Sequence, residues 1–310
     1  DRVRLPAPLL LILVGVAASF VPLVPPVHLE PEIVLLGLLP PLLYAASLQT
    51  SLIDFNANRG PILLLSVGLV IATTATVGVT VHAVLPEVGW PAAWALGAVV
   101  APPDAVAATA IARRIGLPRR IVTILEGESL VNDATALVAL RTAVAAAAGG
   151  VAAADVGRDF LVAAGGGVLV GLGVFALVAA MRTRIREPLL DTGISFVTPF
   201  AAYLLAESVH ASGVIAVVLA GLLLGHKAPI IQTAQSRITE RITWTTVAFL
   251  LENAVFLLIG LQARQLVGDV LTGGLSLGRV ALVCLAALVV VVFTRLAWVF
   301  ATRLLLVAGK

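Results

Sequence analysis

The chain has 310 residues, of which 60% are hydrophobic and 12% are charged, and its formal net charge is +3. A soluble domain carries about 25% charged residues, and its interior is too small to hide so much apolar surface. The composition therefore excludes a soluble globular domain and predicts a protein embedded in a lipid bilayer. The single cysteine, Cys284, excludes a framework of intramolecular disulfides.

Apolar runs recur along the whole chain, whereas a signal peptide contains one short run near the N-terminus. A helix that crosses a bilayer needs ~20 largely apolar residues. The sequence therefore predicts an all-α, polytopic membrane protein with about ten transmembrane helices. Their approximate ranges are 6–24, 32–50, 60–85, 91–112, 121–148, 160–181, 190–208, 211–225, 243–262 and 279–303.

Two connections between these segments carry further expectations. The eighth segment is short and follows the seventh through Ser212 and Gly213, so the pair forms either two crossings or a broken hairpin. The longest polar stretch, 226–243, predicts a loop that is long enough for an interfacial helix.

Basic residues are distributed unevenly among the predicted connections. With a cytoplasmic N-terminus, fifteen of the twenty Lys and Arg residues fall on the cytoplasmic side, while Arg158, Arg264 and Arg279 fall on the other side and two lie within spans. Cytoplasmic loops of membrane proteins are enriched in Lys and Arg. The distribution predicts a multi-pass protein of the cell membrane with its N-terminus in the cytoplasm. It also accounts for the basic composition without a nucleic-acid partner.

Several ionisable residues lie within the predicted spans, where a charge costs at least ~2.5–3.5 kcal/mol and usually serves a function. These residues are Asp104, Glu128, Asp133, Glu207, Glu252 and Arg295. The sequence shows no nucleophile–base arrangement and no ATP-binding loop, so it predicts neither an enzyme nor a bound cofactor. Buried charges in a polytopic protein instead favour an ion pathway.

The fourth predicted span contains Pro102 and Pro103 immediately before Asp104. Each proline lacks a backbone donor and clashes with the preceding turn, so we expect the helix to break near 101–104. A broken helix at membrane depth is tolerated where it is buried in protein or lines a water-filled cavity, and transporters build substrate sites in this way. The neighbouring carboxylate favours a binding site over a simple proline kink.

The fifth predicted span places Ser129 and Asp133 four residues apart, on one helix face, and Asn132 beside them. A hydroxyl, a carboxylate and a carbonyl from the broken fourth span are oxygen ligands that suit a hard cation. Because the Asp133 carboxylate can hold either a cation or a proton, the two would compete for it. Competition of this kind is the physical basis of exchange.

Glu128 needs a positive partner if it is ionised within the membrane. Arg295 is the one cation at sufficient depth in a later span. Removal of one member of a buried ion pair destabilises a protein by more than the intact pair stabilises it, because a lone charge remains buried. We therefore expect Glu128 and Arg295 to form a structural clamp.

These residues also carry a family resemblance. The stretch 103–107 reads Pro-Asp-Ala-Val-Ala, and the stretch 127–133 reads Gly-Glu-Ser-Leu-Val-Asn-Asp, with Glu128 placed 24 residues after Asp104. Together with the segments 212–225 and 252–261, they resemble the monovalent cation–proton antiporter family. The similarity is to its Asn-Asp branch, which includes NhaP and the animal sodium–proton exchangers.

The resemblance implies an NhaA/NhaP-like fold of inverted repeats and elevator-type alternating access. It treats 1–310 as a single transmembrane antiporter domain. The expected ion-binding core is 91–148 together with 243–303, and the expected scaffold, dimerisation and linking helices are 6–85 and 160–208. The family has about two more core helices after the one that carries the Arg, so we expect the chain to be C-terminally incomplete.

The resemblance also assigns residue roles. Asp133 would bind the cation and the proton, assisted by Asp104, Ser129 and the carbonyl of Pro103. Asn132 would hold the broken helix, Glu128 would pair with Arg295, and Glu252 falls on a family position. An Asn before the essential Asp resembles the electroneutral branch, which exchanges one cation for one proton.

One departure bears on cation preference. The family usually has Thr or Ser before the first Asp, whereas this chain has Pro103, so one hydroxyl ligand is lost. The predicted activity is secondary antiport of Na⁺, Li⁺ or K⁺ against H⁺ by a homodimer in the lipid bilayer, with Na⁺ as the expected cation. Two alternatives remain at this stage: a channel or passive cation pathway that uses the same carboxylates, and a fragment that does not transport.

Overall fold

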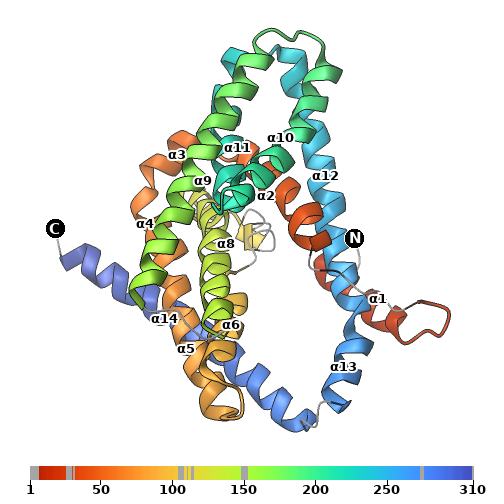
Figure 1. Cartoon of the computed structure of the whole chain (residues 1–310), viewed down its shortest axis with the longest axis vertical. Coiled ribbons are helices and arrows are strands. Elements are labelled where there is room, and N and C mark those ends of the chain that lie inside the picture. Colours follow the sequence, from red (N-terminus) through yellow and green to blue (C-terminus); the bar gives the residue numbers. More distant parts are fainter. Residues whose placement is uncertain are drawn as a thin grey trace. The chain divides into compact units, whose positions relative to one another are not determined.

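The computed structural model describes residues 7–25, 30, 32–103, 108–109, 111–112, 115–147, 153–272 and 276–308. All regular secondary structure in these ranges is helical (Figure 1). The predicted all-α, polytopic architecture is therefore confirmed. The helices are α1 (Ala7–Ser19), α2 (Leu39–Gln49), α3 (Leu52–Ala57), α4 (Arg59–Leu63), α5 (Val70–Val84), α6 (Trp90–Val100), α8 (Arg119–Ala147), α9 (Ala153–Arg182), α10 (Pro188–Ser208), α11 (Gly213–Ile231), α12 (Ala234–Leu261), α13 (Ala263–Thr272) and α14 (Leu277–Ala308), with π-helical segments η1 (Ile33–Leu38) and η2 (Leu64–Leu69).

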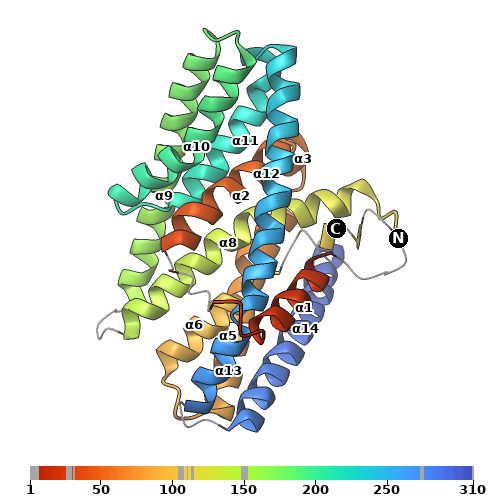
Figure 2. The ribbon, with the colours of Figure 1, turned by 90° about the vertical axis from the view of Figure 1, so that its right-hand side faces the viewer.

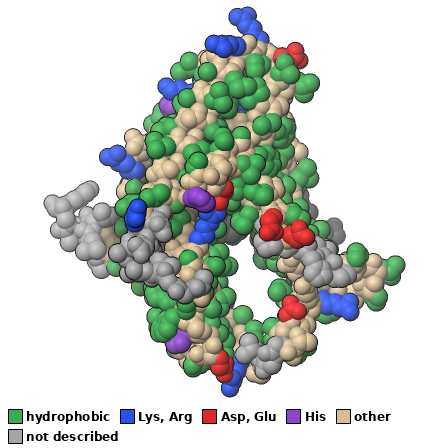
Figure 3. Space-filling view, viewed as in Figure 1, with side chains coloured by type: hydrophobic (Ala, Val, Ile, Leu, Met, Phe, Trp, Pro, Cys, Tyr) green, Lys and Arg blue, Asp and Glu red, His purple; other side chains and the backbone are tan. Residues whose placement is uncertain are grey.

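Seven helical stretches in the described ranges are long and apolar enough to cross a membrane. Three shorter apolar helices, Ala7–Ser19, Ile33–Gln49 and Trp90–Val100, coincide with three further predicted segments. Hydrophobic side chains are spread over the face shown in Figure 3, among backbone and other side chains. The structure therefore has the helical, membrane-embedded character that the composition predicts, while the number of ten crossings stays a prediction.

The prediction of a long polar loop at 226–243 is wrong. Helix α11 continues to Ile231 and α12 begins at Ala234, so Gln232 and Thr233 alone connect them. The Thr233 hydroxyl accepts a hydrogen bond from the Ser236 amide at 3.1 Å, which caps the first turn of α12. Polarity misled the loop prediction because a helix can continue beyond the apolar core of a bilayer with polar residues on its surface.

Two contact units make up the chain. In the first unit, 1–54 with 161–273, α2 packs against α10, α11 and α12, and α1 packs against α12. The close crossing of α1 and α12 depends on Gly15 and Gly260, which face each other. A Cβ atom on Gly15 would lie 2.5 Å from the Leu257 carbonyl oxygen, and one on Gly260 would meet the Ile12 carbonyl. Figure 2 shows α10 and α11 side by side within this unit.

In the second unit, 55–160 with 274–310, α5 packs against α6 and α14, and α6 packs against α8. Gly97 of α6 faces the backbone of α5, and a Cβ atom there would lie 3.2 Å from the Gly78 nitrogen. These units group the segment 59–84 with 91–147, and the segment 234–272 with 161–208. The resemblance placed 60–85 with the scaffold and 243–262 with the core, and this division into core and scaffold stays a prediction.

Candidate functional site

The candidate site begins on α8, which carries four of the predicted residues on two adjacent stripes. Glu128 and Asn132 lie four residues apart on the inward face and are buried, with exposed fractions of 1% and 0%. Ser129 and Asp133 occupy the neighbouring stripe and are half-buried. The helical spacing therefore points one carboxylate–amide pair into the unit and places a hydroxyl–carboxylate pair beside it.

Glu128 and Arg295 form an ion pair with two hydrogen bonds. Arg295 Nη1 donates to Glu128 Oε1 at 2.8 Å, and Nη2 donates to Oε2 at 2.9 Å. The Glu128 side chain is 2% exposed and that of Arg295 is 33% exposed. The planar guanidinium fork matches the two carboxylate oxygens, which is the strong form of such a contact. The pair fixes α14 to α8 at this level.

Two further contacts hold α14 in the second unit. Trp298, one turn after Arg295, donates its indole N–H to the carbonyl of Leu64 at 3.2 Å. The Thr294 and Thr76 hydroxyls lie 3.0 Å apart, which joins α14 to α5. Leu64 begins the π-helical segment η2, and π-helical turns are frequent near functional sites.

Segment η2 also contacts α8 directly. The Ser66 hydroxyl donates to the Ile62 carbonyl at 2.7 Å and approaches the Glu128 carbonyl at 3.2 Å. The adjacent Gly127 leaves room for Ile62, whose Cδ1 would lie 2.5 Å from a Cβ atom on that glycine. The backbone around Glu128 is therefore held from one side by η2, while its side chain is held by Arg295.

Asn132 has an unusual environment. Its side chain is fully buried, yet neither Oδ1 nor Nδ2 has a hydrogen-bond partner in the part of the chain that the structure describes. A buried polar group without a partner costs about 1–3 kcal/mol, so such a group calls for a functional or structural reason. An amide carries both a donor and an acceptor, and it can therefore bind a carbonyl and a cation or water at the same time.

The end of α6 lies against α8. Helix α6 ends at Val100, immediately before Pro102 and Pro103, where the sequence predicts a break. Ala101, at the helix end, packs with Ala136 of α8 and Val70 of α5. A helix end leaves its last carbonyl groups without intrahelical partners. The contact with Ala136, three residues after Asp133, brings such a helix end to the site.

The structure describes most of the predicted site residues. Pro103 is half-buried next to the end of α6, whereas Asp104 lies outside the described residues. Glu252 is half-buried on α12, which belongs to the first unit, while Asp133 belongs to the second. Among the described residues no three His, Cys, Asp or Glu side chains are grouped to hold a metal ion.

Sequence reasoning missed two sets of polar residues. Ser66 and Trp298 fasten η2 to the site helices, and their only sequence signal is a polar or indole group within an apolar run. In the first unit, Arg182 directly follows the predicted span 160–181, and its side chain is 1% exposed and pairs with Glu240 and Asp191. These acidic residues were not singled out because they lie near the ends of predicted spans.

The fold defines a class: a polytopic helical membrane protein in which a buried amide and a neighbouring carboxylate on α8 lie beside the end of α6. A family profile described as the transmembrane part of sodium/hydrogen exchangers matches residues 1–309. The chain belongs to the sodium/hydrogen exchanger family.

Individual relatives agree with this assignment. The chain is 41% identical to an uncharacterised Na⁺/H⁺ exchanger of Mycobacterium tuberculosis over 98% of its own length and 56% of the relative. It is 32% identical to a sodium, potassium, lithium and rubidium/H⁺ antiporter of Bacillus subtilis, over 85% of this chain and 40% of that one. The chain thus spans about half the length of these curated relatives.

A solved structure shares the fold. The sodium–proton antiporter MjNhaP1 of Methanocaldococcus jannaschii, at pH 8, superimposes with a TM-score of 0.67 and 19% sequence identity. The match covers 82% of this chain and 63% of that one. The likeness supports an NhaP-like helical arrangement in this chain.

Proposed function

We propose that the protein is a secondary antiporter that exchanges a monovalent cation for protons across a membrane. The observation that carries the proposal is the arrangement on α8: half-buried Asp133 beside the unpartnered Asn132 amide, next to the end of α6. Membership of the sodium/hydrogen exchanger family and the named activities of the relatives support it. The cation and the proton are substrates, and the proposal includes no cofactor and no enzymatic step.

Asp133 carries the exchange in this proposal. Its carboxylate holds either a cation or a proton, so binding of one substrate displaces the other. Ser129, Asp104 and the Pro103 carbonyl supply further oxygen ligands for a cation. The Asn132 amide, which has no partner among the described residues, is available in this proposal to hold the chain that follows α6. The Glu128–Arg295 pair acts as a clamp that keeps α8 and α14 in register and does not itself carry the substrate.

Several finer features belong to the same proposal. Exchange is electroneutral, one cation for one proton, and Na⁺ is the expected cation. The site reaches the two sides of the membrane in turn by an elevator-type movement of an ion-binding core against a scaffold. The protein works as a homodimer in the cell membrane with a cytoplasmic N-terminus, which the uneven distribution of Lys and Arg supports.

The test uses the full-length protein in liposomes with an acidic lumen and a trapped pH dye. Na⁺, Li⁺ or K⁺ is added outside, with and without a clamp on the membrane voltage. We expect added Na⁺ to raise the lumenal pH at a rate that the clamp leaves unchanged. A cation-driven current without coupled proton movement would instead identify a channel, and no response to any cation would identify a protein that does not transport.

The same assay tests the site through Asp133→Asn. This change removes the charge and keeps the size of the side chain, so we expect exchange to fall to the level of empty liposomes while the protein still folds. The matched control is Asp269→Asn, an exposed carboxylate on α13, which should exchange as the unchanged protein does. Normal exchange by the Asp133→Asn protein would show that the site is elsewhere.

A further inference from the structure

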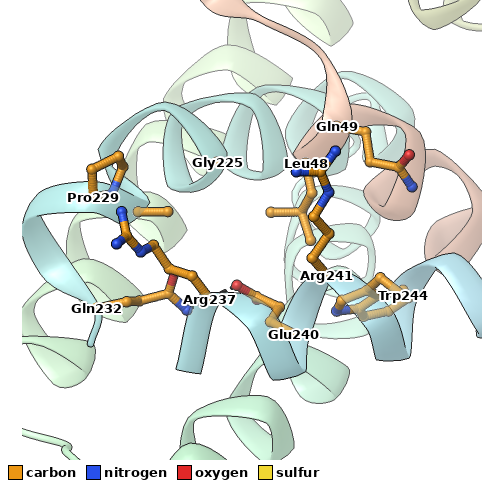
Figure 4. Close-up of a pocket in the computed structure, with 10 residues that line it drawn as sticks. Leu48, Gln49, Gly225, Pro229, Gln232, Arg237, Glu240, Arg241 and Trp244 are labelled. Atoms are coloured by element: carbon orange, nitrogen blue, oxygen red, sulfur yellow. Dashed lines mark hydrogen bonds between the residues drawn. The ribbon is translucent and has the colours of Figure 1, made fainter. Parts of the chain in front are cut away.

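The first unit contains a cavity of about 280 Å³ that the proposed exchange does not use. It lies where α2 and α11 end and α12 begins (Figure 4). Its polar lining comes from Gln49, Gln232, Arg237, Glu240 and Arg241. Its apolar lining includes Leu48, Pro229 and Trp244.

A buried charge cluster adjoins this cavity, which it reaches through Gln232 and Glu240. Arg182 donates to both Glu240 oxygens, at 2.7 and 3.2 Å, and its Nε lies 3.4 Å from Asp191. Gln232 donates its amide N–H groups to Asp191 at 2.6 Å and to Glu240 at 2.8 Å. One guanidinium thus faces two carboxylates, which leaves an excess negative charge in the cluster when both are ionised.

The cluster also leaves an acceptor without a donor. Both hydrogen bonds of Gln232 use its Nε2, which fixes the orientation of the amide, and Gln232 Oε1 is buried with no partner among the described residues. An unpaired buried acceptor favours a ligand that brings an N–H donor. The Glu240 carboxylate beside it favours a donor that is positively charged.

The rim of the cavity has the opposite character. Arg237 and Arg241 lie four residues apart on one face of α12, and in Figure 4 their side chains extend along two sides of the cavity with Glu240 between them. Guanidinium groups are well suited to phosphate oxygens, which they bind with paired hydrogen bonds. The rim therefore favours an anionic group on the same ligand.

Exposed apolar side chains surround this rim. Ile230 is 77% exposed, and Ile238 and Ile242, which follow the two arginines, are 56% and 63% exposed. Apolar residues next to basic residues at the end of membrane helices are typical of the region where lipid headgroups lie. A ligand of the cavity can therefore reach it from the bilayer surface.

We propose that this cavity binds a phosphoethanolamine group, with the phosphate held by Arg237 and Arg241 and the ammonium directed to Gln232 Oε1 and Glu240. An anion alone would leave the Gln232 acceptor unpaired, and a cation alone would face two arginines. A zwitterion can pair its ammonium with Gln232 and Glu240 and its phosphate with the two arginines at the same time. The site goes beyond cation–proton exchange, because it lies in the first unit and uses none of the residues around Asp133.

The first test needs no variant. The full-length protein in detergent is titrated with phosphatidylethanolamine, its mono- and dimethylated forms, phosphatidylcholine and phosphatidylglycerol, and the thermal unfolding midpoint is measured, because a ligand of the folded state raises it. We expect phosphatidylethanolamine to bind at least about tenfold more tightly than phosphatidylcholine, whose trimethylated nitrogen has no N–H. Equal effects of phosphatidylethanolamine, phosphatidylcholine and phosphatidylglycerol would overturn the proposal.

The second test removes the rim. The double variant Arg237→Gln with Arg241→Gln should lose the preference for phosphatidylethanolamine and keep the unfolding midpoint of the lipid-free protein. Arg186→Gln is the matched control, because this arginine is exposed in the α9–α10 connection of the same unit. Unchanged phosphatidylethanolamine binding by the double variant would overturn the site.

Soluble glycerophosphoethanolamine distinguishes the source of the group. Protection by this compound alone, lost in the double variant, would identify a water-soluble ligand with the proposed chemistry. Protection by the lipid alone would identify a membrane headgroup. Loss of lipid binding with unchanged Na⁺-driven exchange would leave the proposed function intact, so the two proposals fail separately.

Discussion

Arg182 in the first unit and Arg295 in the second are both paired with carboxylates, and their surroundings differ. Arg182 is enclosed, with no exposed side-chain surface, and meets two carboxylates that Gln232 bridges. Arg295 is one-third exposed and meets Glu128 alone. The first arrangement shares one guanidinium among several partners, whereas the second is a single pair next to the unpartnered Asn132. The comparison predicts a larger loss of stability when the enclosed Arg182 is removed than when the partly exposed Arg295 pair is broken.

The largest expected effect comes from Arg182→Met. The change leaves Asp191 and Glu240 buried without their guanidinium, and breaking a buried ion pair from one side costs about 3–5 kcal/mol. We expect a low yield and a strongly lowered thermal midpoint in purified protein. Arg186→Met, at an exposed position nearby, should unfold at the normal temperature. An unchanged midpoint in Arg182→Met would refute the structural role of the cluster.

A smaller loss of stability is expected from Glu128→Gln in the second unit. The change leaves Arg295 without a counter-charge, but that side chain is partly exposed, so we expect about 2–3 kcal/mol. Unfolding and exchange are both measured for this variant. A separate double-mutant cycle compares the unfolding free energies of Glu128→Met, Arg295→Met and the double variant. A clamp predicts that the double variant recovers part of the lost stability. Purely additive losses would contradict a direct coupling.

The crossing of α5 and α6 can be tested with Gly97→Ala. The added Cβ would press on the carbonyl of Thr74 and the nitrogen of Gly78, and both are backbone atoms. Overpacking of this kind costs about 1–3 kcal/mol, and here it should also shift the end of α6 and slow exchange. Gly60→Ala, where no atom lies within 4 Å, is the matched control and should be neutral or slightly stabilising. Equal behaviour of the two variants would argue against close packing at Gly97.

The smallest expected effect is that of Trp298→Phe, which keeps an aromatic ring and removes the N–H that binds Leu64. The lost hydrogen bond should cost about 1 kcal/mol. If η2 positions α8, the cation affinity, measured from the concentration dependence of exchange, should fall while the expression level stays nearly normal. A change in expression alone would show that Trp298 only packs.

The sequence predicted the helical class, the end of α6 and the Glu128–Arg295 contact for identifiable reasons. Pro102 and Pro103 limit helix geometry locally, and α6 ends at Val100 just before them. Membrane depth left Glu128 few cationic partners, and Arg295 is indeed bonded to it. The polar stretch 226–243 misled, because the pattern of polarity does not reveal where a helix ends outside the apolar core.

The partners of Arg182 show where sequence reasoning stops. Asp191 and Glu240 lie nine and 58 residues further along the chain, and each sits near the end of a helix where charges are ordinary. Nothing local tells that three such ends meet and exclude water. The unpartnered Asn132 amide is equally invisible from sequence, since its environment depends on helices from several parts of the chain.

By itself, the sequence predicted a helical membrane protein, the end of a helix before Pro102 and two polar pairs on one face of the next long helix, because hydropathy, proline chemistry and helical spacing act over short distances. Its motifs carried the resemblance to the cation–proton antiporters. Tertiary structure alone decided which arginine is enclosed, which polar atoms lack partners, how α4 to α6 pack with α8 and α14, and where a polar cavity remains. These features arise from side chains far apart in the sequence, and their free energies depend on how completely the surrounding helices exclude water.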